Sequence, residues 1–273
     1  MKQPNLTKHP PIEVIFWLVP LAITALFVWI LGDLVSGGIQ AISWQFLTTA
    51  PLDTGRAGGI APILVSTGLI LAICLATALP ISLATAIMLA EFTSDRSLFG
   101  RLVRRSLDIL AGVPSIVFGL FGNAFFAKTL GLGFSLLSGG LTLACMVLPI
   151  LIRSTEAGLR AVPNEYRLNS ASLGISRAST LLHVLLPAAM PGLVAGLVLG
   201  IGRAIAETAA LIFTSGYVDR MPTSLWDSGR SLSIHIYDLS MNVTGGDTNA
   251  YGSALVLIVI LLAINAIANL LRS

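Results

Sequence analysis

Arg203 and Glu207 stand four positions apart in the segment GIGRAIAETAAL, residues 200–211, which is otherwise built mainly from glycine and aliphatic residues. A guanidinium stays charged and offers a planar fork of N–H donors that matches the oxygens of phosphate-like anions. Positions i and i+4 share one face of a helix, so the carboxylate of Glu207 can reach Arg203. The spacing allows two roles that do not exclude each other. One is a structural ion pair, and the other is an arginine that meets an anion while Glu207 holds it in place.

Three glycines, Gly192, Gly196 and Gly200, recur every four residues before Arg203. Small residues at this spacing let a second helix approach closely within a membrane. Gly196 and Gly200 lie seven and three residues before Arg203, so we expect them to share its face. The charged face should therefore point into the protein and away from lipid.

The composition indicates that the solvent is a membrane. Apolar residues make up 55% of the 273 positions and charged residues only 11%, whereas a soluble domain is about 25% charged. Apolar runs of about 20 residues are long enough to cross a ~30 Å hydrocarbon layer as helices. A charge inside that layer costs roughly 3 kcal/mol. The net charge of +3, without a basic tract, gives no indication of nucleic-acid binding.

Six segments read as membrane spans in an all-α, polytopic chain. They are 12–32, 60–90, 106–127, 134–152, 190–214 and 251–271. The third has Asp108 near its start and Pro114 inside it, so we expect it to be bent or partly buried. Asp108 is expected to pair with Arg104 or Arg105. The first segment lacks a small-x-small cleavage site and is interpreted as a retained span.

Lysine and arginine placement predicts the orientation, because cytoplasmic loops carry an excess of both. With the N-terminus inside, the inside segments hold eleven: Lys2, Lys8, Arg96, Arg101, Arg104, Arg105, Arg153, Arg160, Arg167, Arg177 and Arg272. The outside segments hold four: Arg56, Lys128, Arg220 and Arg230. Both termini and the loop 153–189 are therefore predicted to be cytoplasmic, and the loop 215–250 periplasmic. His235, in that outer loop with Arg220 and Arg230, is expected to be solvated or to attract an anion.

The loop 153–189 reads as two short helices. Pro163 suits the first position of a helix, and Gly174 can adopt the left-handed conformation that ends it. Ser176 then caps a second helix, which Pro187 is expected to end. A helix–turn–helix beneath a membrane bundle has the right shape to fit a groove in a soluble partner.

This loop resembles the signature of binding-protein-dependent ABC importer permeases. In that signature, a glycine is followed by nine residues and then by an aliphatic residue, any residue, Leu and Pro. Here the glycine is Gly174, and the closing residues are VLLP at 184–187. The family pattern begins with Glu-Ala-Ala, but the aligned positions here are Leu168, Asn169 and Ser170. Glu165 lies about one helical turn earlier.

Further segments narrow the resemblance to phosphate importer permeases of the PstA type. They are LAGVPSIVFGLFG at 110–122, GIGRAIAETAALIFTSG at 200–216 and MPTSLWDSGRSLSIHIY at 221–237, with GGIAPILVSTGLIL at 58–71 and LAEF at 89–92. The resemblance runs from about residue 12 to the end. It implies a single transmembrane domain over 1–273 with the type I importer, MetI-like fold.

By this resemblance the chain is expected to be the permease subunit of an ATP-driven, high-affinity phosphate importer in a bacterial inner membrane. The implied partners are a second permease of the PstC type, an ATPase dimer of the PstB type and a periplasmic phosphate-binding protein of the PstS type. The chain itself is expected to hold no catalytic residue, metal or cofactor, with ATP and Mg²⁺ on the ATPase. Its nearest approach to a phosphate loop, GNAFFAKT at 122–129, lacks the glycine before the lysine.

The site residues implied are of three kinds. Arg203 and Glu207 are assigned to the substrate pathway. Contact with the ATPase is assigned to Glu165, Tyr166, Arg167, Leu168, Gly174 and Pro187. Helix packing is assigned to Gly192, Gly196 and Gly200. Two alternatives stay open: a permease for another oxyanion such as sulfate or molybdate, and a membrane scaffold or regulatory subunit.

Overall fold

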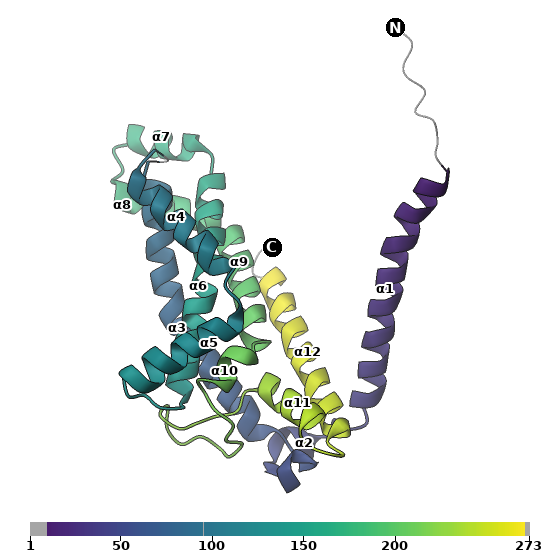
Figure 1. Ribbon diagram of the computed structural model, residues 1–273. Helices are drawn as coiled ribbons and strands as arrows, with labels where there is room; N and C mark the ends of the chain where they lie inside the picture. Colours follow the sequence, from purple (N-terminus) through teal and green to yellow (C-terminus); the bar gives the residue numbers. More distant parts are fainter. Residues whose placement is uncertain (1–9, 95, 271–273) are drawn as a thin grey trace.

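The chain is mainly helical. The computed structural model describes residues 10–94 and 96–270. Within this described part, five helical runs are long and apolar enough to cross a membrane, and one bent pair of helices would make a sixth. The long helices are α1 (Pro10–Gly38), α3 (Ala61–Ile87), α6 (Leu136–Ala161), α9 (Leu186–Ile205) and α12 (Asp247–Leu270) (Figure 1). Wider π-helical turns extend two of them: η2 (Met88–Phe92) follows α3, and η4 (Leu181–Leu185) precedes α9.

The segment predicted as a third span, 106–127, is divided between two helices. These are α4 (Leu98–Ala111) and α5 (Ser115–Gly122), the latter continued by η3 (Asn123–Thr129). The two axes meet at 102°. Pro114 explains the break, because proline lacks a backbone N–H and disfavours the helical conformation of the residue before it.

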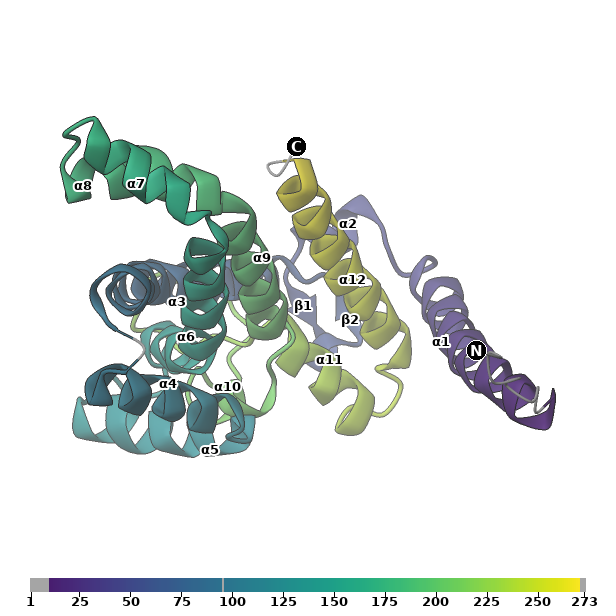
Figure 2. The same cartoon turned by 90° about the horizontal axis from the view of Figure 1, so that it is seen from above.

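Helix α6 lies at the centre of the bundle, in contact with α3 and with α9 (Figure 2). Of its most apolar stretch, 67% is buried, against 0% for α1, which identifies α6 as the packing centre. Its neighbours in the core include Ile70, Cys74, Leu143, Val147 and Leu151. Hydrophobic burial adds little between helices in lipid, so close packing of such side chains holds the bundle together.

Glycines bring α6 and α9 into backbone contact. A Cβ atom on Gly192 would lie 2.6 Å from the Cα atom of Gly158, which is closer than real atoms approach. A Cβ on Gly196 would lie 2.5 Å from the Cβ of Ser154, and one on Gly200 would lie 3.2 Å from a methyl group of Leu151. The glycine stripe of α9 therefore faces α6, and Gly158 supplies the matching small residue.

Helix α1 joins the bundle at its C-terminal end. A Cβ on Gly37 would lie 2.9 Å from the ring of Tyr251 on α12, and the hydroxyl of Tyr251 donates to Asp33 at 2.8 Å. The earlier part of α1 stands apart from the other helices (Figure 1).

Short elements gather at the end of the bundle that lies opposite α7 (Asn164–Ser172) and α8 (Arg177–Thr180) (Figure 1). They are α2 (Trp44–Thr48), β1 (Pro51–Leu52), η1 (Asp53–Gly55), β2 (Ala57–Gly58), α10 (Ala209–Ile212) and α11 (Leu232–Met241). The two strands pair antiparallel, Pro51 with Gly58 and Leu52 with Ala57. The segment 215–250, expected as a loop, thus contains the helix α11, which packs on α12 and α3.

The expectation of a solvated His235 is wrong. Its side chain lies in the buried face of α11, and its Nδ1 is 3.4 Å from Nη1 of Arg230. Burial, with the nearby Arg230 cation, lowers the pKa of His235 to about 4, so the imidazole is neutral at physiological pH. Arg230 is itself engaged, by Asp238 at 3.0 Å and by the carbonyl of Tyr217 at 2.9 Å. These contacts join α11 to the segment that precedes it, at the end of the bundle opposite α7 and α8.

The contact between α6 and α9 predicts a difference between two glycine-to-alanine changes. Gly192→Ala forces the helices apart and should lower the free energy of unfolding by about 1–3 kcal/mol. Gly68→Ala on α3 meets nothing within 4 Å, and by helix propensity it should be neutral or stabilising by up to ~1 kcal/mol. Thermal unfolding in detergent, followed by tryptophan fluorescence, compares the two. Equal transition temperatures would contradict the backbone contact.

Candidate functional site

Glu207 does not share a helix with Arg203. Helix α9 ends at Ile205, and the short helix α10 begins at Ala209. The Glu207 carboxylate accepts the backbone N–H of Ala210 at 3.1 Å. It thereby satisfies a free donor at the start of α10, as capping side chains do. The predicted ion pair is therefore wrong, because a break in the helix falls between its two members.

Arg203 lies in the last turn of α9 and is exposed on this chain. Within the residues that the structure describes, its side chain has no ion pair or hydrogen bond. Gly200 faces α6, but a helix turns by about 100° per residue, so Arg203 points roughly 60° away from that contact. Of the face that was expected to point into the protein and away from lipid, Glu207 is buried and Arg203 is exposed on this chain.

The segment 153–189 contains the helix–turn–helix that its sequence indicates. Helix α7 begins directly after Pro163, and Gly174 has the left-handed φ of +70°. Ser176 caps α8 by accepting the N–H of Ser179 at 3.3 Å. Pro187 does not end the second helix, contrary to the prediction. Helix α8 continues through η4 into α9, where the first turn tolerates a residue without an N–H.

The residues assigned to partner contact divide into two groups. Glu165, Tyr166 and Leu168 are exposed on α7, and Leu173 is 77% exposed just after it. Leu168, at the position of the signature glutamate, is 60% exposed, so an apolar side chain stands where the family pattern has a carboxylate. Arg167 turns inward instead.

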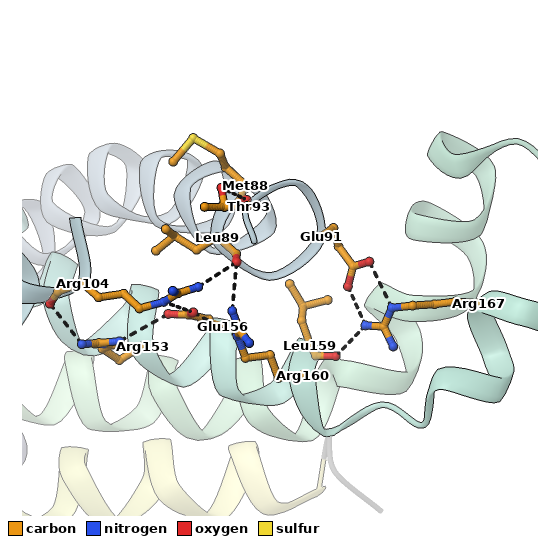
Figure 3. A network of polar contacts seen from close by, with 10 residues as sticks. All are labelled: Met88, Leu89, Glu91, Thr93, Arg104, Arg153, Glu156, Leu159, Arg160 and Arg167. Carbon is orange, nitrogen blue, oxygen red and sulfur yellow. Dashed lines mark hydrogen bonds and ion pairs between the residues drawn. The ribbon is translucent and has the colours of Figure 1, made fainter. Parts of the chain in front are cut away.

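Arg167 joins α7 to the end of α3. Its Nη2 and Nε atoms contact the two carboxylate oxygens of Glu91 at 2.5 and 3.1 Å, a bidentate arrangement (Figure 3). It also donates to the carbonyls of Leu159 and Val162, both at 3.0 Å. The hydrogen bonds that Arg167 donates to Glu91 raise the pKa of Arg167. The side chain therefore joins α7 to η2 and to the end of α6.

A second cluster lies one turn deeper and centres on the buried Glu156 of α6. Its carboxylate accepts from Arg104 at 2.8 Å and from Arg160 at 3.1 Å, with Arg153 at 3.5 Å (Figure 3). Arg104 and Arg160 also donate to the carbonyl of Leu89, at 3.0 and 3.1 Å. We call these residues the Glu156 cluster. It joins α4, α6 and η2.

Sequence reasoning missed this cluster. In the sequence, the arginines of the cluster indicate the membrane orientation, and Arg104 is also a candidate partner of Asp108. In the structure, Asp108 contacts Arg153 instead. A local signal was present. Arg153, Glu156 and Arg160 are spaced at i, i+3 and i+7, which places them on one face of the last turns of α6.

A cavity of about 310 Å³ lies between η2 and the helices α7 and α8. Its polar lining comes from Glu91, Arg167, Arg177 and Thr180, and its apolar lining includes Phe92, Ile175 and Leu185. Beside the cavity, Leu159, Val162 and Leu185 form an apolar cluster that packs η4 against the end of α6.

Comparison with known proteins places these features in a family. The family described as "Binding-protein-dependent transport system inner membrane component" matches residues 78–273. The chain is 33% identical over 261 residues to "Phosphate transport system permease protein PstA 1" of Mycobacterium tuberculosis (strain CDC 1551 / Oshkosh), covering 93% of this chain and 83% of that protein. It is 29% identical over 268 residues to "Probable ABC transporter permease protein YqgI" of Bacillus subtilis (strain 168), covering 93% and 91%.

A solved structure of the methionine ABC transporter MetNI, in an inward-facing conformation, has a similar fold. The TM-score is 0.59 at 17% identity, over 77% of this chain and 94% of the other. This likeness concerns the fold, and it confirms the MetI-like, all-α architecture that the sequence resemblance implied.

The Glu156 cluster predicts a strong effect of one neutral substitution. Glu156→Gln removes the anion shared by several guanidinium groups and should lower the free energy of unfolding by about 3 kcal/mol. Glu165→Gln changes the same side chain at an exposed position of α7 and should leave stability within about 0.5 kcal/mol. Thermal unfolding in detergent compares both variants with the parent chain. A Glu156→Gln chain as stable as the Glu165→Gln chain would refute a stabilising role for the cluster.

Proposed function

Because this chain belongs to the binding-protein-dependent transport system inner membrane component family, which matches residues 78–273, we propose that it is the permease subunit of an ATP-driven importer of inorganic phosphate. The observation that carries the choice of substrate is the near full-length similarity to a phosphate transport permease. The chain then forms one half of the translocation pathway.

The position of Arg203 supports a role in that pathway. Its guanidinium group is exposed on the surface of this chain, near the end of the spanning helix α9. No carboxylate of the described residues lies at ion-pair distance from it. Exposure of such a charge to lipid is costly. A second permease facing α9 would enclose Arg203 in a polar passage, where its fork of donors can bind phosphate. Glu207, held at the start of α10, acts by fixing the helix break rather than by restraining the arginine.

The coupling helices support the assignment of a soluble partner. The exposed surface of α7 presents Tyr166, Leu168 and Glu165, while Arg167 and the Glu156 cluster bind the same region to α3, α4 and α6. We assign α7 and α8 to contact with an ATPase dimer of the PstB type, which holds ATP and Mg²⁺. The other proposed partners are a PstC-type permease and a PstS-type phosphate-binding protein.

The orientation follows from this assignment. The end of the bundle that carries α7 and α8 lies in the cytoplasm, and the end with α2 and α11 faces the periplasm of a bacterial inner membrane (Figure 1). The charge bias of the sequence supports the same orientation and places both termini inside. Three of the cations in that bias, Lys2, Lys8 and Arg272, lie outside the described residues. The proposed unit is one transmembrane domain over 1–273.

Substitutions at Arg203 test the proposed function in proteoliposomes that contain the two permeases and the ATPase, with binding protein outside and ATP inside. The parent complex should take up radiolabelled phosphate, and excess sulfate or molybdate should not compete. Arg203→Lys keeps the charge but loses the bidentate fork, so uptake should fall by about 10-fold or more. Arg203→Gln should abolish uptake while the complex still assembles.

Glu207→Gln is the matched control, because its side-chain carbonyl can still accept the N–H of Ala210. Phosphate uptake by the Glu207→Gln complex should stay near that of the parent. The Arg203→Gln complex should be inactive both alone and in combination with Glu207→Gln. Uptake of sulfate or molybdate in place of phosphate would favour another oxyanion. An assembled complex that transports none of these anions would favour a scaffold. Near-normal uptake by Arg203→Gln, at matched abundance, would exclude Arg203 from the pathway.

The turn at Gly174 predicts a separate loss of coupling. A β-branched residue is strained at a φ of +70°, so Gly174→Val should disturb α7 and α8 without altering the spans. We expect phosphate-stimulated ATP hydrolysis to fall several-fold, or the ATPase to dissociate. Gly131→Val has a comparable φ of +71° in the outer segment after η3, and it should leave the ATPase bound. Full ATP-driven uptake by Gly174→Val would show that this loop does not couple the subunits.

A further inference from the structure

Helix α4 is a charged helix that lies between the long helices α3 and α6 in the chain order and is too short to cross a membrane by itself. It has 14 residues, which gives a length of about 21 Å, short of the ~30 Å hydrocarbon layer. It bends by 102° from the helix that follows. Its sequence, LFGRLVRRSLDILA, holds four charged residues. The surroundings of α4 therefore have to satisfy both its charges and its large apolar side chains.

The inner face of α4 is occupied by this chain. Gly100 and Leu107 are buried, and Arg104 reaches into the Glu156 cluster. The outer face carries an apolar stripe in which Leu98, Leu102 and Ile109 are 78%, 65% and 70% exposed. This stripe has no cover from the described residues of the chain.

A basic stripe runs beside the apolar one. Arg101 and Arg105 are exposed at i and i+4, so their guanidinium groups lie on one face. Within the described residues, neither side chain has an ion pair or a hydrogen bond, whereas Arg104 between them is bound to Glu156. The two free cations are thus directed outward.

The lipid–water interface offers acyl chains to the apolar stripe and charged headgroups to the basic stripe. Water alone would hydrate three large apolar side chains, and hydrocarbon alone would enclose two unpaired cations. Helices with an arginine-bearing polar face and a leucine-rich apolar face lie in the plane of the interface. Phosphodiester headgroups accept the N–H groups of arginine, and anionic lipids attract each cation near the surface.

We propose that α4 is an interfacial helix that binds anionic phospholipid, with Arg101 and Arg105 on the headgroups and Leu98, Leu102 and Ile109 among the acyl chains. The proposal rests on the membrane location of the family and not on which anion is transported. Because α4 also supplies Arg104 to the Glu156 cluster, bound lipid holds in place a helix on which the coupling region depends.

The first test measures lipid preference. Native mass spectrometry of the importer complex, titrated from detergent with phosphatidylglycerol or phosphatidylcholine, gives the ratio of the two affinities. Removing each cation should cost about fivefold in preference for phosphatidylglycerol. Arg101→Gln with Arg105→Gln should therefore lower the ratio by about 25-fold. The same pair changed to lysine should keep most of it.

A control with equal loss of charge separates this site from general electrostatics. Lys128→Gln with Arg220→Gln removes two exposed cations from the segments that the sequence places outside, and it should leave the ratio unchanged. An equal fall in both double variants would overturn the proposal. Displacement of phosphatidylglycerol by the same concentration of inorganic phosphate would assign the arginines to a free anion and would also overturn it.

The second test locates the apolar stripe. Spin labels are placed singly at positions 102 and 109 of the full chain in its complex, with Cys74 and Cys145 replaced by alanine, in phosphatidylglycerol-containing nanodiscs. Strong relaxation by oxygen and weak relaxation by a water-soluble nickel chelate would support insertion into lipid. Strong relaxation by nickel would mean a hydrated helix, and weak relaxation by both would mean cover by a partner subunit. Each of these would overturn the proposal, and because neither test measures transport, such a failure would leave the phosphate pathway untouched.

Discussion

A buried carboxylate organises the half of this permease that carries α7 and α8. Glu156 is enclosed on α6 and requires cations within reach, because an isolated buried charge is strongly disfavoured. Arg104 and Arg160 meet that requirement and also serve the carbonyl of Leu89, where α3 has passed into the irregular turns of η2. The Glu156 cluster therefore neutralises the buried carboxylate, supplies hydrogen-bond donors to the carbonyl of Leu89 and holds α4 in position through Arg104. Arg167 and Glu91 continue the same arrangement to α7.

The bundle also depends on positions without a side chain. Gly158 and Gly192 let the backbones of α6 and α9 touch. Because no side chain lies between the two helices at this contact, one helix cannot shift toward the other there. Helix α6 thus carries the Glu156 cluster near one end and the contact with α9 along its length, and α9 ends at the turn that holds Arg203. Helices in direct contact therefore connect the region of the Glu156 cluster with the turn that holds Arg203.

The elements that sequence predicted well are those decided by local chemistry. The apolar runs, the start of α7 after Pro163 and the left-handed Gly174 depend on backbone geometry within a few residues. The Glu156 cluster was not predicted, since Arg104 lies 52 positions from Glu156 and Glu91 lies 76 from Arg167. Such pairs form only when the bundle brings α4, η2 and α7 together. His235 was misplaced for the same reason, because its burial comes from the packing of α11 and not from its polar sequence.

The failed pairing of Arg203 with Glu207 has a physical consequence for anion transport. The i, i+4 rule assumes one continuous helix, and the chain departs from it when the Glu207 carboxylate binds the N–H of Ala210. Within one helix the carboxylate would have cancelled the attraction of Arg203 for a second anion. At the start of α10 the carboxylate instead accepts the backbone N–H of Ala210, and Arg203 lies at the C-terminal end of α9, where the helix dipole favours a cation. Each charge is thus stabilised by a different helix end. The break after α9 separates them and leaves the guanidinium group without a carboxylate at ion-pair distance among the described residues; the proposed role of Arg203 in anion transport rests on this separation.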